Sequence, residues 1–391
     1  MGIGLGLVGL GEFGSAFAGL FLTHPFVDRL ALCDLEGDRL ARFAQDERFA
    51  AKLGANGLYT SFHDLLNSDV DAVALFTQPW LHAEQAVEAM ERGKHVYSAV
   101  PVVMLPNGME MLDWCHRIIE TCLSTGMRYM LGETTVYHAD AMFCRRKAGE
   151  GAFGHFIHAE GDYLHSFDSP GSDLREVYRH RFTGRAGEMW RAKLEEYRAR
   201  GDLDSPMHYP THSTSGPISV MKAHAVKVSA WGTRPFSADP WFHDTLTGFG
   251  NVTALYRMSN GATMRICEHR ECSIIREDFR VYGTKASYEF GTWYEREKPI
   301  RKTIEEMRDP LPPEVHEAFA SFAGPERVYR GHGGSHPYLV HEFVSAVVED
   351  RMPFINAWEA ARYMAAGVTA HQSALRDGEA LPVPDWGDAP R

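Results

Sequence analysis

The chain has 391 residues and a formal net charge of −12, with 44% hydrophobic and 24% charged residues. This length predicts two domains, and the acidic charge argues against nucleic acid or an anionic membrane surface as a partner. No apolar run is long enough to span a membrane, and no basic segment precedes an apolar one at the N-terminus. The six cysteines form no C-x-x-C pair, which is typical of reduced thiols, so we expect a cytoplasmic protein.

A glycine-rich stretch follows the first predicted strand. Residues 3–8 are an apolar run, and GLGEFG comes directly after it, with Gly9, Gly11 and Gly14 in G-x-G-x-x-G spacing and Glu12 and Phe13 between them. Such glycines allow a tight turn, close approach of a pyrophosphate, and close packing of the next helix. That helix offers free N–H groups and a positive dipole end to a phosphate.

An acid at the end of the second predicted strand indicates which dinucleotide binds. Asp34 follows the apolar run 30–33 and lies 20 residues beyond Gly14. A carboxylate there hydrogen-bonds the adenosine ribose and repels a 2′-phosphate, which favours NAD over NADP. The alternative is that Asp34 is only an acid at a helix N-terminus.

Strands and helices alternate over the first 130 residues. Further strands are predicted near 58–60, 71–77, 95–99 and 128–131, and helices around 40–44, from a capping box at 61–64, at 83–92 before Gly93, and at 107–125 before Gly126. This alternation predicts an α/β fold, with a Rossmann doubly wound parallel sheet as the domain at residues 1–130.

The pattern changes in the second part of the chain. Alternating strands are predicted at 156–165, 225–231, 252–258, 262–269, 279–282 and 287–290, with a hairpin turn at 259–261 and helices at 337–349 and 358–376. They predict an α+β domain at residues 131–391 with a large, mostly antiparallel open sheet covered by helices on one face. Residues 166–206 are polar and weakly periodic, and we expect an insertion at the edge of this sheet.

The order of these elements and motifs resembles the Gfo/Idh/MocA oxidoreductase family over essentially the whole chain. The resemblance rests on the glycine motif, Asp34, TQPWLH at 77–82, GKHV at 93–96 and the Gly283-Thr284 turn. It implies that a nicotinamide binds at the carboxyl edge of the parallel sheet, next to the substrate, and that the protein is a homo-oligomer (a dimer or tetramer). The cofactor contacts that it implies beyond the glycine motif and Asp34 are Thr77, Pro79, His82, Val100 and Pro101.

One position departs from the family pattern. After GKHV the family has Glu-Lys-Pro, whose lysine contacts the reacting hydroxyl, whereas this chain has Val100-Pro101 after Ala99. A valine cannot donate a hydrogen bond or accept a proton, so another group must hold the hydroxyl. The valine, YPTH at 209–212 and GHGG at 331–334 make the chain similar to the family's NAD-dependent glycoside hydrolases, typified by α-N-acetylgalactosaminidases.

This resemblance implies several site residues in the second domain. His212 is the best catalytic candidate because it lies where the family carries a histidine at a helix start, and Tyr163 and His165 lie on one face of the long strand's end. The expected substrate-binding residues are Tyr209, Thr211, His332 and His336, and no metal site is predicted. Histidine suits a general base, whereas tyrosine does so only with a lowered pKa. The alternative for each residue is a structural role through local hydrogen bonds or core packing.

Our leading hypothesis is redox-neutral cleavage of a sugar or glycoside. Bound NAD oxidises a sugar hydroxyl carbon, the ketone acidifies the neighbouring C–H, the leaving group is eliminated, water adds, and the carbon is reduced again. His212 is assigned to the hydroxyl, and Tyr163 or His165 to the second proton. Two alternatives are a net NAD-dependent dehydrogenase of a sugar or cyclitol and a non-enzymatic NAD(H)-binding regulator.

Overall fold

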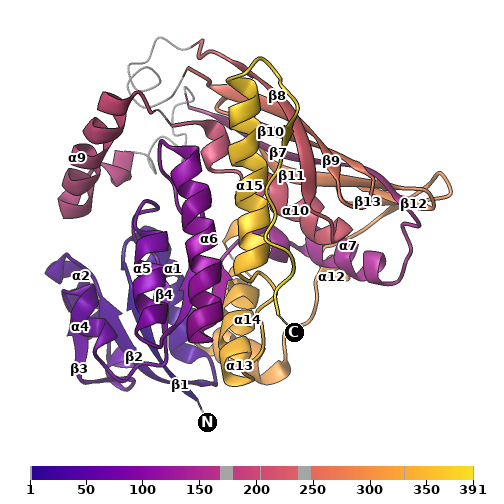
Figure 1. Cartoon of the computed structure of the whole chain (residues 1–391). Coiled ribbons are helices and arrows are strands. Elements are labelled where there is room, and N and C mark those ends of the chain that lie inside the picture. The colour runs from indigo at the N-terminus through magenta and orange to yellow at the C-terminus, as the bar shows by residue number, and fades with distance from the viewer. Residues whose placement is uncertain (1, 168–178, 203, 237–247, 330, 391) are drawn as a thin grey trace.

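A parallel six-stranded sheet forms the N-terminal part of the computed structural model, which describes residues 2–167, 179–202, 204–236, 248–329 and 331–390 (Figure 1). Its strand order is β3-β2-β1-β4-β5-β6. The strands are β1 (Ile3–Val8), β2 (Val27–Cys33), β3 (Leu53–Tyr59), β4 (Ala72–Leu75), β5 (His95–Ser98) and β6 (Tyr129–Leu131). All paired strands are parallel, and β1 and β4 are buried along their whole length. This is the doubly wound order expected of a Rossmann sheet, which confirms that prediction.

The helices between these strands begin and end at the signals in the sequence. They are α1 (Glu12–Thr23), α2 (Gly37–Ala44), α3 (Glu47–Ala50), α4 (Phe62–Leu66), α5 (His82–Glu91) and α6 (Gly108–Thr125). The Ser61 side chain accepts a hydrogen bond from the Asp64 N–H, and the Asn107 side chain accepts from two N–H groups in the first turn of α6. Gly126 ends α6 with φ 75°, a conformation that favours glycine.

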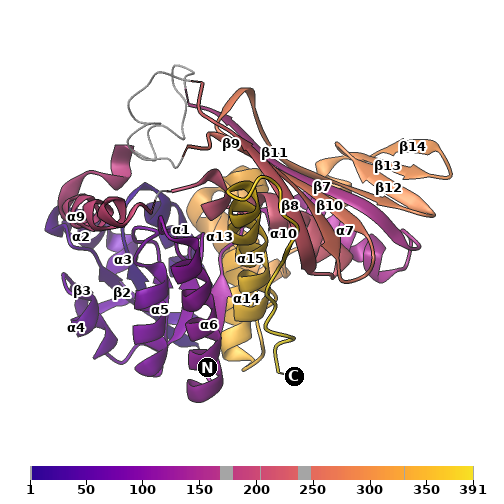
Figure 2. The ribbon, with the colours of Figure 1, turned by 45° about the horizontal axis from the view of Figure 1, so that its top comes forward.

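A nine-stranded sheet forms most of the second part of the molecule (Figures 1 and 2). Its order is β14-β13-β12-β11-β7-β10-β9-β8-β15. The strands are β7 (Phe156–Ser166), β8 (Ala225–Thr233), β9 (Asn251–Met258), β10 (Thr263–His269), β11 (Glu271–Gly283), β12 (Ala286–Glu289), β13 (Thr292–Glu295), β14 (Lys298–Arg301) and β15 (Leu381–Pro382). The β7–β10 pair is parallel and the other pairs are antiparallel, which confirms a mostly antiparallel sheet.

Helices cover one face of this sheet and connect it to the other one. They are α7 (Ala139–Gly149), α10 (Thr211–Met221), α12 (Ile304–Met307), α13 (Pro313–Ala323), α14 (His336–Val348) and α15 (Ala357–Ala374), with short 3-10 helices η1 (Thr135–Tyr137), η2 (Pro206–His208), η3 (Pro325–Arg327) and η4 (His332–Gly334). α10 packs on β7 and β11, whereas α13 and α14 return to pack on α1. We propose a domain boundary near residue 130; it separates the two sheets but not every helix that covers them.

The polar insertion contains a helix that the sequence pattern did not reveal. α9 (Gly184–Arg200) is 17 residues long and ends at Gly201. Residues 168–178 and 203, which belong to the same insertion, lie outside the described residues. Across the part of the chain that the structure describes, no helix combines the length and apolar character needed to cross a bilayer.

Candidate active site

The glycine motif forms an open cradle at the N-terminus of α1. Gly9 has φ 90°, and a Cβ at Gly14 would collide with the carbonyl oxygen of Gly9, so both positions require glycine. A Cβ at Gly11 would meet no atom within 4 Å. Gly11 is also the N-cap of α1 and provides no side chain to satisfy the first N–H groups. Open space beside free N–H groups fits a pyrophosphate, as the motif predicts.

Asp34 and Arg39 lie where they can influence whether this cradle binds NAD or NADP. The Asp34 carboxylate accepts hydrogen bonds from the backbone N–H groups of Leu10, at 2.6 Å, and Glu36, at 2.9 Å. It is therefore fixed beside the glycine loop, where an adenosine ribose lies in this fold. The Arg39 guanidinium lies 3.4 Å from both carboxylate oxygens and was missed in the sequence. An arginine near this acid is the group that accommodates a 2′-phosphate in NADP-binding proteins.

The other predicted cofactor residues lie where β4 and β5 end. Both ring nitrogens of His82 face backbone carbonyls, with Nδ1 2.9 Å from Pro101 O and Nε2 3.0 Å from Thr77 O. His82 is buried, which lowers its pKa. It joins the loop after β4 to the loop after β5, so it shapes the cofactor edge through the backbone. Val100 is 8% exposed, and its side chain offers no proton to a substrate.

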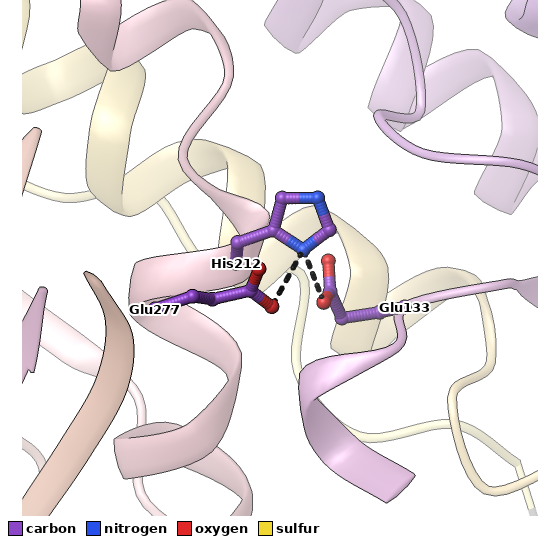
Figure 3. Close-up of side chains that lie close together, drawn as sticks. All are labelled: Glu133, His212 and Glu277. Atoms are coloured by element: carbon purple, nitrogen blue, oxygen red, sulfur yellow. Dashed lines mark hydrogen bonds and ion pairs between the residues drawn. The ribbon is translucent and has the colours of Figure 1, made fainter. Parts of the chain in front are cut away.

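His212 lies between two carboxylates that come from different elements (Figure 3). It is the second residue of α10, and its Nδ1 is 2.8 Å from Glu133 Oε1 and 3.6 Å from Glu277 Oε1. Glu133 follows β6, and Glu277 lies on β11. Nε2 points away from both carboxylates in Figure 3. The two acids therefore hold Nδ1 in place, and Nε2 lies on the side of the ring away from them.

The two carboxylates control the charge of His212. Burial alone would lower its pKa, but the charges of Glu133 and Glu277 raise it to about 9. Burial in turn opposes ionisation of Glu133, yet the charge of His212 and its hydrogen bond hold the pKa of Glu133 below the usual value. Backbone and side-chain groups of Thr135 fix both acids, because its N–H donates to Glu133 and its hydroxyl donates to Glu277. At neutral pH the pair is an imidazolium beside a carboxylate.

Tyr163 and His165 lie beside His212, as their positions on one face of β7 predict. The centre of the Tyr163 ring is 5.2 Å from the centre of the His212 ring and 4.3 Å from that of the His165 ring. Burial raises the pKa of Tyr163 well above its ordinary value, whereas burial and the charge of Arg270 lower the pKa of His165 to about 4. His165 Nε2 is buried and has no hydrogen-bond partner among the described residues. His165 is thus a neutral imidazole that can accept a proton.

A buried ion pair supports this group from behind. The Ser213 hydroxyl donates to the Glu268 carboxylate, which also accepts from Arg270 at 3.0 Å. Glu268 is fully buried and Arg270 is 2% exposed. The Arg270 guanidinium also donates to Pro206 O at 3.2 Å and lies 5.1 Å from the centre of the Tyr163 ring. One buried network therefore holds the start of α10 and the ring of Tyr163.

The predicted substrate-binding residues fall in two places around His212. Tyr209 lies 5.4 Å from the His212 ring, and Thr211 is buried at the first position of α10. His332 Nδ1 and His336 Nε2 are 3.0 Å apart, and the ring of His332 is 5.4 Å from that of Phe13. Burial and the charge of His212 lower the pKa of His332. The GHGG loop thus connects the glycine motif on α1 to the surroundings of His212.

Glu133, His212 and Glu277 also lie close enough together to hold a metal ion. Ligand atoms of Glu133, His212 and Glu277 all lie within 4.8 Å of one another. Their mutual ion pairs and hydrogen bonds already account for this arrangement. The absence of a metal stays a prediction.

Comparison with known proteins matches the N-terminal part of the chain to a family model. Residues 3–133 match the Gfo/Idh/MocA family model, described as an oxidoreductase family with an NAD-binding Rossmann fold. This confirms the family resemblance read from the sequence and the prediction of NAD as the cofactor. The chain is an NAD-dependent enzyme of the oxidoreductase type.

Individual relatives extend the likeness over the rest of the chain. A protein from Streptomyces filamentosus named "Glycosyl hydrolase family 109 protein" is 27% identical over 98% of this chain and 77% of its own length. A levoglucosan dehydrogenase in complex with NADH and levoglucosan has a TM-score of 0.72 at 17% identity, covering 98% of this chain and 100% of its own. Scyllo-inositol dehydrogenase from Lactobacillus casei, with bound NAD(H) and scyllo-inositol, has a TM-score of 0.65 at 15% identity, covering 98% and 99%. At these identities the two structures show a shared fold.

Proposed function

We propose that this enzyme cleaves a glycoside by oxidation of a sugar hydroxyl carbon, elimination of the leaving group, water addition and re-reduction. The observation that carries the proposal is the placement of His212, held through Nδ1 by two acids, beside Tyr163 and His165. The similarity to a protein named for glycosyl hydrolase family 109 supports a glycoside as the substrate class.

The cofactor and the chain divide the work of this reaction. Bound NAD would supply the hydride acceptor for oxidation of the sugar carbon and the hydride for its final reduction, with no net consumption. The glycine loop and Asp34 would hold its pyrophosphate and ribose. Val100 replaces the lysine that the family resemblance leads us to expect, so the proton transfers fall to other side chains of the site.

His212 carries the proton of the hydroxyl that is oxidised. In its neutral form the ring accepts this proton at Nε2, and Glu133 then stabilises the imidazolium through Nδ1. With a pKa of about 9, the neutral ring takes up this proton readily. The imidazolium can return the proton when the ketone is reduced.

Tyr163 and His165 manage the elimination. The neutral imidazole of His165 accepts the C–H proton that the ketone has acidified, and the protonated phenol of Tyr163 donates to the leaving oxygen. His165 then returns its proton to the Tyr163 phenolate; the centres of the two rings lie 4.3 Å apart. Tyr163 is then a neutral phenol and His165 a neutral imidazole again. The net reaction is the addition of water across the glycosidic bond.

A screen of aryl glycosides with and without added NAD⁺ tests this function. We expect aryl alcohol release that requires NAD⁺, exceeds the amount of cofactor many times, and leaves the absorbance near 340 nm constant. Stoichiometric NADH formation without aryl alcohol release would instead support the alternative of a net sugar or cyclitol dehydrogenase, the activity in the names of the two structural neighbours.

A further inference from the structure

The insertion helix α9 contacts the loops that follow three strands of the parallel sheet. At its start, the Arg185 N–H donates to Glu36, two residues beyond Asp34 at the end of β2. In its middle, Trp190 stacks on Trp80 in the loop after β4, with ring centres 5.7 Å apart and planes at 15°. At its end, Tyr197 donates to Glu110 at 2.6 Å, in the first turn of the helix after β5.

These contacts place α9 across one edge of the sheet. In a parallel sheet the carboxyl ends of all strands lie at the same edge, and the neighbours here run β2-β1-β4-β5. Four such strands span about 14 Å, and a helix of 17 residues is about 25 Å long. Figures 1 and 2 show α9 beside the parallel-sheet part of the molecule. The glycine loop after β1 lies between the strands whose loops α9 contacts.

A small cleft of about 20 Å³, room for about one water molecule, lies between α9 and the loop after β4. Trp80, Met104, Arg181, Trp190 and Asp204 are among the residues that line it. Trp80 is 9% exposed, and its indole N–H has no hydrogen-bond partner among the described residues. A buried indole N–H normally finds an acceptor. The cleft therefore combines an aromatic wall, a cation and a donor that lacks an acceptor oxygen.

We propose that α9 forms the outer wall of the NAD site and retains the bound dinucleotide. Ligands of open α/β sheets bind outside the carboxyl ends of the strands, which is the edge that α9 crosses. A dinucleotide at this edge would lie against α9 and the loops that α9 contacts. The cofactor leaves only when α9 separates from the loops after β2, β4 and β5. This inference depends on NAD binding and not on glycoside cleavage.

The rate of NADH release, measured without sugar, tests the wall. Protein loaded with NADH is mixed with excess NAD⁺, and the fluorescence of bound NADH is followed. Trp190→Ala removes the stack on Trp80 and should raise the release rate about tenfold. Met189→Ala is the matched control, because Met189 is the preceding residue of the same helix and 52% exposed; its release rate should equal that of the unmodified protein.

A second variant guards against a folding defect. Tyr197→Phe keeps the ring and removes only the hydroxyl that donates to Glu110, so we expect a smaller increase in the release rate. Thermal unfolding of each variant without cofactor verifies that the fold is intact. An unchanged release rate in folded Trp190→Ala, or in Tyr197→Phe if the first variant does not fold, would overturn the proposal. Because no glycoside is present, this outcome leaves the proposed function untouched.

Discussion

At the scale of single residues, the acids around His212 decide when it can act as a base. With a pKa of about 9, His212 is mostly protonated at pH 7, and only about one molecule in a hundred carries the neutral ring. A base must be neutral, and the neutral form increases as the pH rises toward the pKa. The proposed oxidation should therefore speed up in alkaline solution.

The pH dependence of kcat/KM for glycoside cleavage measures this directly. We expect a rise of about tenfold per pH unit up to about pH 9. Glu133→Gln keeps the side-chain shape but removes the charge, so the pKa of His212 falls and the break moves to lower pH. His116→Ala, at an exposed histidine, should leave the profile unchanged. A rate that falls as the pH approaches 9 would mean that His212 acts as an acid.

Asp34 carries the prediction about the cofactor. Asp34→Ala should weaken NAD binding and relax the preference over NADP, because the acid both bonds the ribose and repels a 2′-phosphate. Arg39, 3.4 Å from this carboxylate, should then favour NADP further. Titration of each variant with both cofactors checks the effect. Tighter binding of NADP than of NAD by the unmodified protein would show that Asp34 has been misassigned.

The sequence located His212, Tyr163 and His165 but not the acids that control His212. Glu133 lies just beyond a strand end, where an acid is as easily solvated as buried, and in the fold it is fully buried. Glu277 lies on β11, whose register against β7 brings it opposite Tyr163. The one sequence signal for Glu133 is its position two residues after the apolar run 129–131, at the carboxyl end of a predicted strand.

At the scale of elements, the buried Glu268–Arg270 pair joins β10 to the start of α10. Burial raises the pKa of Glu268 to about 7 although Arg270 lowers it, so without Arg270 this acid is left buried, unpaired and protonated. Arg270→Met should therefore lower the free energy of unfolding by about 3 kcal/mol, the lower end of the cost of breaking a buried pair. Denaturant unfolding measures this loss. Arg48→Met, which breaks an ion pair at the surface, is the control and should change little. Equal free energies of unfolding for Arg270→Met and the unmodified protein would show that the pair does not stabilise the fold.

Capping residues and buried runs made most elements of the parallel sheet predictable. Asn107 and Gly126 mark both ends of α6 because each solves a local backbone problem. β11 was predicted as 279–282 but extends over Glu271–Gly283, because its first half is exposed or half-buried and carries no alternating pattern. In α9, the buried Trp190, Leu194 and Tyr197 follow helical spacing, a signal hidden by the surrounding arginines and glutamates.

At the scale of the whole molecule, the site exists because the two sheets meet. Glu133 follows the last strand of one sheet, and Tyr163 and Glu277 lie on neighbouring strands of the other. Sequence motifs identify residue types, but the pairing of β7 with β11 and the return of α14 to α1 are long-range contacts that no local pattern encodes. A homo-oligomeric state and a cytoplasmic location stay predictions.

In the proposed function, His212 enables an oxidation that acidifies the proton on the neighbouring carbon of the sugar. The most direct measurement is exchange of that proton with solvent deuterium by NAD-loaded His212→Ala, with His116→Ala as control. We predict that exchange and cleavage both fall about 10²–10⁴-fold, while NAD affinity stays nearly unchanged because His212 lies on α10 and is not part of the glycine motif. Exchange at the normal rate in His212→Ala would contradict the account and transfer the oxidation step to Tyr163 or His165.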